Sequence, residues 1–270
     1  MKEPIKKKIW IAMAVLFVLV FIASSVLLVM NLRGKRIDTD KYKKSDVPSS
    51  DTTTASDSSQ SGEAEPTSAP EPTVANPIDF DRLVSENPDI YAWIIVPGTP
   101  IDYPVVQSDI SDEYYLRRDY LGKASISGCI FTQFYNKKDF SDRNTIVYGH
   151  YMWDDTFFGS LHKFRDPEFF DNNSEITVYT ADRKLTYEIF AAYEYDNRHI
   201  LFSFDFTDDA VYEAYLQSCL ASDGNAHNVR QGTVLTKDDK IITLSTCTQN
   251  SDPNKRYLVQ GVLRKNDKAG

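Results

Sequence analysis

Residues 9–30 form an uninterrupted apolar run, mostly Val, Leu, Ile, Phe and Ala, and none of these 22 residues is charged. At about 1.5 Å per residue, a helix of this length spans the roughly 30 Å hydrocarbon layer of a membrane. A cleavable signal peptide would have a shorter apolar region, of about 7–15 residues, followed by a small-x-small cleavage site. This run is longer, and no Ala-x-Ala follows it. The sequence therefore predicts a cytoplasmic tail and an uncleaved transmembrane anchor in residues 1–36.

The flanks do not decide the orientation of this anchor, because basic residues stand on both sides of the run. A long polar region follows, and long regions cross a membrane largely regardless of their charge. We therefore expect a single-pass protein of the cell membrane, with the N-terminus inside and the rest of the chain outside.

Residues 45–76 are mainly Ser, Thr, Pro, Ala, Asp and Glu, with no Lys or Arg. Such a segment buries almost no apolar surface, so residues 37–76 are predicted to be a disordered stalk.

The remaining residues, 77–270, are predicted to form one globular domain outside the cell. They carry 20 basic and 30 acidic residues, and an acidic domain does not attract the phosphate backbone, so we expect no nucleic-acid partner. With three cysteines in the whole chain, disulfide bonds do not hold the fold. His162, His199 and His227 have no partner at metal-ligand spacing, and no Cys-x-x-Cys motif exists. We therefore expect no metal and no cofactor.

The regular elements predicted in this domain are mostly β-strands. The strand-like runs are residues 93–96, 103–107, 128–133, 145–150, 176–180, 185–195, 240–246 and 257–264. Every second residue from 185 to 193 is apolar, which indicates a strand buried on one face. Residues 78–87 and 208–220 are predicted helices, the second with Val211, Tyr215 and Cys219 on one stripe. About eight strands with few helices indicate a mainly β protein, an antiparallel or mixed β-barrel.

Three residues that could carry chemistry stand at strand ends, where side chains are held by a rigid scaffold. His150 ends the run Thr-Ile-Val-Tyr-Gly-His, Cys247 ends Ile-Ile-Thr-Leu-Ser-Thr-Cys, and Arg256 opens Arg-Tyr-Leu-Val-Gln. A Cys, a His and an Arg suffice for acyl transfer, as nucleophile, proton donor and clamp for an oxyanion or a substrate carbonyl. By periodicity alone, a Cys after an apolar strand is more often a core residue than a nucleophile.

These motifs, in this order, resemble those of the sortases, which are membrane-anchored cysteine transpeptidases of Gram-positive bacteria. The similarity covers roughly residues 78–266 and includes Trp93-Ile, Tyr103-Pro-Val-Val-Gln, Tyr115-Leu and Ser127-Gly-Cys-Ile-Phe. The Thr-Leu-Ser-Thr-Cys form, the helix before the barrel and the helix before the last strands are similar to class B. The motifs are specific as a set, whereas no single one of them would be.

The resemblance implies a sortase-type eight-stranded β-barrel with His150, Cys247 and Arg256 at one end. It implies that Cys247 attacks the carbonyl of the Thr in the C-terminal sorting signal of a surface protein and forms a thioester. A peptide amine of the peptidoglycan would then resolve this thioester. Arg256 would hold substrate carbonyls or the oxyanion, and His150 would protonate the leaving amine. Ser245 and Leu116 stand where class B members line the substrate groove.

Two positions depart from the family pattern. Asp112 stands where an Asn is more usual, so the contact of that Asn is not transferred to it. Gln249 stands where some members have an acidic residue, so an acid-assisted triad is not supported.

Other interpretations stay open at this point. One is a sortase of another class or a hydrolysing relative, which builds pili or only cleaves the signal. No lid segment with an Asp-Pro-Trp motif precedes the barrel, which argues against the pilin-polymerising class. Another is a surface-tethered binding domain in which Cys247 is inert. The sorting signal itself could resemble Asn-Pro-x-Thr or Leu-Pro-x-Thr-Gly.

Overall fold

The structure is a computed structural model that describes residues 10, 13–25, 40–44, 73–221, 227–247 and 252–270. Residues 13–25 are helical. Within the described ranges, no helix is both long and apolar enough to cross a bilayer. The predicted anchor over residues 9–30 lies only in part within these ranges, and the same holds for the predicted stalk over residues 37–76.

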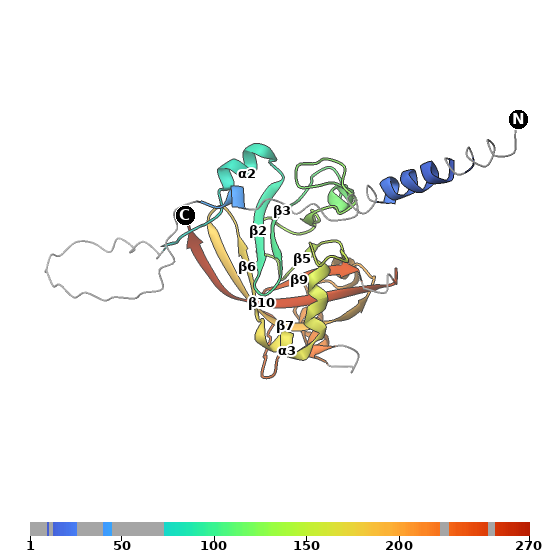
Figure 1. Ribbon diagram of the computed structural model, residues 1–270. Coiled ribbons are helices and arrows are strands. Elements are labelled where there is room, and N and C mark those ends of the chain that lie inside the picture. The colour runs from blue at the N-terminus through green and yellow to red at the C-terminus, as the bar shows by residue number, and fades with distance from the viewer. Residues whose placement is uncertain (1–9, 11–12, 26–39, 45–72, 222–226, 248–251) are drawn as a thin grey trace, which may run out of the picture.

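Eight strands close into a mixed β-barrel (Figure 1). They are β2 (Ile90–Val96), β3 (Ile101–Val106), β4 (Ile130–Thr132), β5 (Asn144–Tyr148), β6 (Glu175–Tyr179), β7 (Arg183–Asp196), β9 (Ile241–Cys247) and β10 (Lys255–Ala269). Around the barrel their order is β10-β9-β5-β4-β3-β2-β6-β7, and pairing of β7 with β10 closes the ring. The pairs β3–β4 and β5–β9 are parallel, and the other pairs of the ring are antiparallel. The predicted eight-stranded barrel is confirmed.

One barrel strand changes face half-way along its length. The alternate side chains of β7 up to Ile189 point into the barrel interior. Ile189 pairs with Gly261 and Ala191 pairs with Gln260, so Phe190 is an extra residue in β7, a β-bulge. A bulge reverses the alternation, and Ala191 therefore packs outside the barrel, in the apolar cluster beneath the helix α5 (Asp209–Leu220). The expectation that the face continues unbroken to residue 193 is wrong for this reason.

Both predicted helices are present. α2 (Phe80–Glu86) follows Asp79, whose carboxylate accepts a hydrogen bond from the backbone N–H of Arg82. α5 (Asp209–Leu220) begins after Asp208, which caps its first turn in the same way. The side chains that α5 buries against the barrel are Tyr212, Tyr215, Leu216 and Cys219. Tyr215 and Cys219 of the predicted stripe are therefore buried, whereas Val211 is only partly buried and Tyr212 takes its place.

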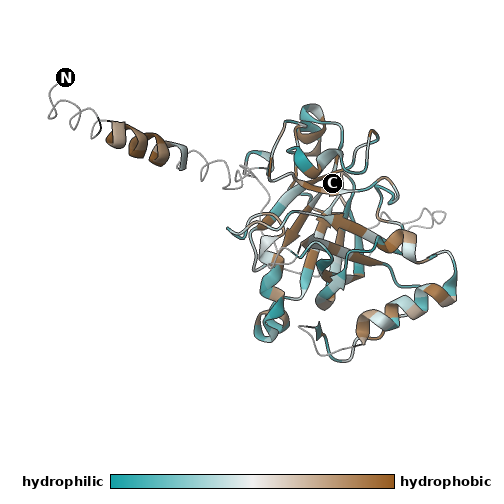
Figure 2. Ribbon diagram, turned by 90° about the vertical axis from the view of Figure 1, so that its right-hand side faces the viewer, coloured by the Kyte–Doolittle hydropathy of each residue, from teal (hydrophilic) through white to brown (hydrophobic). Residues whose placement is uncertain are grey.

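Several short elements of the described chain escaped prediction. They are η1 (Asp40–Tyr42), η2 (Tyr114–Arg117), η3 (Gly159–Arg165), α3 (Pro167–Asn172), α4 (Ile200–Ser203), β1 (Thr73–Val74) and β8 (Asn228–Val229). None is long enough to show a helical or strand period in the sequence. Figure 2 shows that apolar residues gather on the barrel strands, whereas much of the connecting chain is polar. Three of the short elements, η2, η3 and α4, nevertheless contact the candidate active site.

Residues 40–44, predicted to be part of the stalk, pack against the domain instead. Tyr42 is fully buried, and its ring meets Trp93 and Tyr120 edge-on at centroid distances of 6.0 and 6.1 Å. Its hydroxyl donates to Glu86 Oε2 at 2.5 Å and lies 3.0 Å from the hydroxyl of Tyr120. One aromatic residue in a polar segment gives no periodic signal, which is why the sequence did not indicate this contact.

The other end of the predicted stalk also belongs to the domain. β1 pairs with the end of β10, with Thr73 opposite Lys268. The buried side chain of Asn76 donates to the carbonyl of Thr180 at 2.8 Å. Residues 45–72 lie outside the described residues, and their assignment to a stalk stays a prediction.

The buried position of Tyr42 predicts a large effect on stability. Replacing Tyr42 with Ala in the full-length chain is expected to lower the free energy of unfolding by about 3 kcal/mol or more, because a buried aromatic ring is lost. Tyr42→Phe keeps the ring and loses only the hydroxyl contacts, at a cost of about 1 kcal/mol. Urea denaturation followed by intrinsic fluorescence measures both changes.

A matched control is Trp153→Ala, which removes a larger ring that is 59% exposed. It should change the stability by no more than about 0.5 kcal/mol. If Tyr42→Ala were as mild as this control, residues 40–44 would not be part of the folded domain.

Candidate active site

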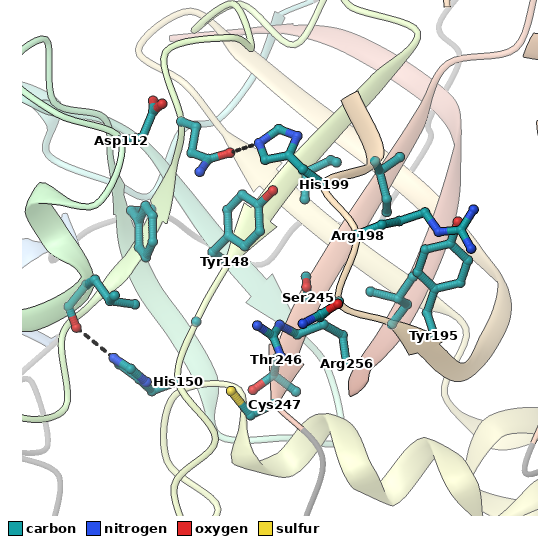
Figure 3. A pocket seen from close by; sticks show the side chains of 18 of the residues that line it. Asp112, Tyr148, His150, Tyr195, Arg198, His199, Ser245, Thr246, Cys247 and Arg256 are labelled. Atoms are coloured by element: carbon teal, nitrogen blue, oxygen red, sulfur yellow. Dashed lines mark hydrogen bonds between the residues drawn. The ribbon is translucent and has the colours of Figure 1, made fainter. Parts of the chain in front are cut away.

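Three segments bring His150, Cys247 and Arg256 to one cavity of about 320 Å³ (Figure 3). Cys247 is the last residue of β9, and His150 comes two residues after the end of β5. β5 and β9 run parallel, with Tyr148 opposite Ser245, so both chains leave the sheet at the same edge. Arg256 lies opposite Cys247 in the antiparallel β9–β10 ladder. The register of the ladder thus accounts for this meeting of a thiol, an imidazole and a guanidinium.

The three cysteines differ in exposure. Cys247 is exposed, whereas Cys129 and Cys219 are buried, and all three are free thiols. Cys129 and Cys219 belong to separate core clusters, and no disulfide joins them. Burial raises the pKa of both core thiols. Cys247 is therefore the accessible thiol among the described residues.

His150 is oriented by a backbone carbonyl of η2. Its Nε2 lies 2.6 Å from the carbonyl oxygen of Leu116. A carbonyl can only accept, so Nε2 carries the proton and donates it to this bond. Nδ1 is therefore the ring nitrogen that is left to exchange a proton with a bound molecule.

Gly128 provides the space for this contact. It has a φ of +57°, and a Cβ at this position would lie 2.6 Å from the oxygen of Leu116 and 2.9 Å from Cδ2 of His150. A side chain here would displace the imidazole, the carbonyl or both. Glycine is thus required both by the backbone conformation and by the close approach.

One terminal nitrogen of the Arg256 guanidinium is held by backbone carbonyls of residues just before it. Its Nη1 donates to the carbonyls of Lys255 and Pro253, at 2.9 and 3.2 Å. Its charge also acts on the nearby ring of Tyr148. Burial, with the carboxylate of Asp112 adding to it, raises the pKa of Tyr148 to about 12, although Arg256 opposes the rise. Tyr148 is therefore a neutral wall of the cavity.

The cavity continues away from Cys247 as a groove with both apolar and polar side chains (Figure 3). Leu116 and Ser245, both predicted to bind substrate, line it, and so does Asp112. A further wall comes from the end of β7, the start of α4 and the segment between them, and from the residue after β4. The residues concerned are Asp196, Asn197, Arg198, His199, Ile200 and Gln133.

Sequence reasoning missed this wall. Its two segments, which lie far apart in the chain, are joined by a hydrogen bond of 2.7 Å between His199 Nε2 and Gln133 Oε1 (Figure 3). Burial lowers the pKa of His199, so this imidazole is neutral at neutral pH. A loop residue of this kind has no periodicity, and only the fold shows where it lies. Among the described residues, no group of three or more His, Cys, Asp or Glu side chains is placed to hold a metal ion.

A family model of the sortase domain matches residues 94–264. The chain belongs to the sortase family. It is 34% identical over 186 residues to Sortase B of Listeria monocytogenes, a match that covers 68% of this chain and 72% of that protein. Sortase B of Staphylococcus aureus is 31% identical, over 67% of this chain and 72% of that protein.

Solved structures agree with this assignment. Clostridium perfringens sortase B superposes with a TM-score of 0.62 at 33% identity, over 69% of this chain and 100% of that one. A Staphylococcus aureus sortase B in complex with substrate gives a TM-score of 0.61 at 29% identity, over 69% of this chain and 85% of that one. The protein is accordingly a class B sortase, and thus an enzyme, a cysteine transpeptidase.

The close approach of Gly128 to the imidazole gives a test of this geometry. Gly128→Ala in this sortase is expected to lower the rate of peptide transfer about tenfold or more, because the His150–Leu116 contact has to shift, and small misplacements of reacting groups are costly. The initial rate of transfer measures this, and the melting temperature is recorded alongside.

The control is Gly232→Ala. Gly232 has a φ of +78°, and nothing lies within 4 Å of an added Cβ. The Gly232→Ala variant has a similar backbone strain of about 1–3 kcal/mol, but its added Cβ meets no other atom. It should therefore retain the wild-type rate of transfer. An equal loss of activity in both variants would mean that strain, and not displacement of His150, is responsible.

Proposed function

We propose that this sortase cleaves the C-terminal sorting signal of surface proteins after its Thr, through a thioester on Cys247, and transfers the protein to a peptide amine of the peptidoglycan. The observation that carries the proposal is the meeting of an exposed thiol with His150 and Arg256 at one cavity. The exposure of Cys247 speaks against an inert binding domain, because the two cysteines that serve packing alone are buried.

In the first half-reaction, the thiolate of Cys247 adds to the carbonyl carbon of the Thr. The C–N bond to the next residue then breaks, and its electron pair leaves with the nitrogen. The imidazolium of His150 gives a proton to this leaving amine, and Nδ1 is the atom for this transfer because Nε2 is bonded to Leu116. The product is a thioester between the Thr and Cys247.

In the second half-reaction, an amine of the cell-wall peptide attacks the thioester carbonyl. The neutral imidazole of His150 takes the proton that the amine loses as the new amide bond forms. The bond between sulfur and carbon breaks, and the thiolate of Cys247 and the imidazolium of His150 are restored. No oxidant or cofactor is needed, because an amide is exchanged for an amide.

Arg256 is proposed to stabilise the oxyanion of both tetrahedral intermediates or to hold substrate carbonyls. A guanidinium has five N–H donors. In the described part of the chain, the hydrogen bonds of Arg256 run from Nη1, so Nε and Nη2 are available to a substrate oxygen. A fixed positive charge beside the reacting carbonyl stabilises the transition state more than the bound substrate, because negative charge develops on the carbonyl oxygen during the reaction.

The groove is proposed to bind the sorting signal. Leu116 supplies an apolar contact and Ser245 a hydroxyl near the thiol, while Asp112 and His199 line the groove further away. Two relatives support a peptide substrate and an amine acceptor. One Staphylococcus aureus sortase B structure is described as a substrate complex, and another sortase B structure is described as a complex with triglycine.

The proposed chemistry is tested by following the mass of the full-length chain, purified in detergent. It is incubated with peptides that carry an Asn-Pro-x-Thr or a Leu-Pro-x-Thr-Gly signal, with and without triglycine as acceptor. We expect an acyl adduct on the wild type that the acceptor removes, with one signal preferred. Cys247→Ala should form no adduct, and Cys219→Ala, which removes a buried thiol, should still form one.

The outcomes separate the open interpretations. Cleavage with no capture by the amine would favour a hydrolysing relative. If neither signal gives an adduct and Cys247 also resists a methanethiosulfonate, the interpretation as a binding domain takes the place of the transpeptidase.

We further propose that residues 9–30 anchor the enzyme in the cell membrane, with the N-terminus inside and the catalytic domain outside. The support is the length of the uncharged run in the sequence. Full-length protein should resist extraction of membranes by alkaline carbonate, and protease added to intact protoplasts should digest the domain. A chain that lacks residues 1–36 should be released into the medium or the soluble fraction. A domain that protease reaches only after lysis would contradict the orientation.

A further inference from the structure

His162 lies directly behind the candidate nucleophile, on η3. It is 6% exposed, and its Nε2 is 2.9 Å from the backbone carbonyl oxygen of Cys247. On the other side of the ring, Nε of Arg165 lies 3.2 Å from Nδ1. An arginine Nε–H can only donate, so Nδ1 accepts and Nε2 carries the ring proton. His162 therefore donates to the carbonyl of Cys247, and Arg165 fixes the tautomer that does so.

The ring of His162 is held in place from several sides. It stacks on Tyr257 at a centroid distance of 4.8 Å and meets Tyr151 edge-on at 5.1 Å. Arg165 lies over the same Tyr257 ring and forms an ion pair with Glu194 at 2.5 Å. Burial lowers the pKa of His162 and the charge of Arg165 adds to this, so the imidazole is neutral at neutral pH.

The β-ladder leaves the carbonyl of Cys247 without a strand partner on this side. Ser245 points its carbonyl towards β5 and accepts a hydrogen bond of 3.2 Å from the N–H of Gly149. Carbonyls alternate along a strand, so that of Cys247 points to the same side. β5, however, ends at Tyr148, and its chain then turns to His150. The imidazole of His162 supplies the donor that a further strand residue would otherwise provide.

We propose that His162 is a positioning residue of this enzyme, which fixes the peptide plane of Cys247 and so directs the thiol at the cavity. It does not touch the reacting atoms, and its effect passes through the backbone of Cys247. The proposal rests on the proposed role of Cys247 as the nucleophile. Loss of the hydrogen bond lowers kcat and leaves KM almost unchanged, because the groove that binds the signal is not altered.

Two variants of the full-length enzyme separate positioning from packing. His162→Leu removes the donor, and His162→Gln returns an N–H at the same number of bonds from the Cα atom as Nε2. We expect His162→Leu to lose about tenfold or more in kcat, with KM within about twofold of the wild type. His162→Gln should recover most of this loss.

The chain contains a matched control in His227. Its Nε2 lies 3.1 Å from the backbone carbonyl of Cys219, a buried cysteine that is not at the cavity. His227→Leu and His227→Gln make the same chemical changes to a contact of the same kind. Both should keep the wild-type kcat.

A second readout does not depend on activity. The chain has three cysteines, so labelling with [1-¹³C]cysteine gives three carbonyl resonances. His162→Leu should move the Cys247 resonance upfield and leave that of Cys219 in place, whereas His227→Leu should do the reverse. His162→Gln should keep the Cys247 resonance near its wild-type position.

The two readouts keep failures apart. If the wild type forms no adduct on Cys247, the proposed function fails, while the resonances still report whether His162 holds the carbonyl. The positioning role is overturned if His162→Leu keeps the wild-type kcat. It is also overturned if His162→Gln loses as much as His162→Leu, or if the Cys247 resonance stays in place.

Discussion

The parallel pairing of β5 with β9 is the constraint on which the rest of the site depends. Parallel strands end at the same edge of a sheet, so the residues that follow Tyr148 and the end of β9 must meet. The antiparallel turn back into β10 then brings Arg256 opposite Cys247. Backbone hydrogen bonds thus bring His150 to Cys247 and Arg256, although it lies about a hundred residues earlier in the sequence. Their meeting requires no contact between the side chains themselves.

At the edge of the sheet where β5 and β9 end, some polar groups have no partner on a neighbouring strand. Two short helical elements supply hydrogen bonds to these groups. η2 offers the carbonyl of Leu116 to His150, and η3 offers an imidazole to the carbonyl of Cys247. Both contacts use the rigid barrel on one side and a 3₁₀ turn on the other. Residues three apart eclipse one another in a 3₁₀ helix, which places Arg165 against His162. The barrel therefore sets where the reactive groups lie, and the two turns set how they point.

Much of this architecture could be predicted, because strands buried on one face carry an alternating pattern. All eight barrel strands and both longer helices follow from that pattern and from their caps. The bulge at Phe190 could not be predicted, because an extra residue in a ladder is visible only against its partner strand. His150, Cys247 and Arg256 were found from motifs at strand ends. His162 was missed because a histidine that binds a backbone carbonyl needs no companion residue at a fixed spacing.

The packing of Tyr42 against the domain shortens the distance that the domain could reach from a membrane anchor. A free stalk over residues 37–76 would reach roughly 130 Å when fully extended. Tyr42 is buried in the domain and the N–H of Lys44 donates to the carbonyl of Pro77, so both ends of segment 45–72 are joined to the domain and this segment adds nothing to that reach. If residues 9–30 cross the membrane as proposed, the linker between the membrane and the domain is residues 31–39, which span about 30 Å at most when fully extended. In that case the length of segment 45–72 does not affect the distance between the domain and the lipid surface, and doubling that length would cost only about 0.6 kcal/mol.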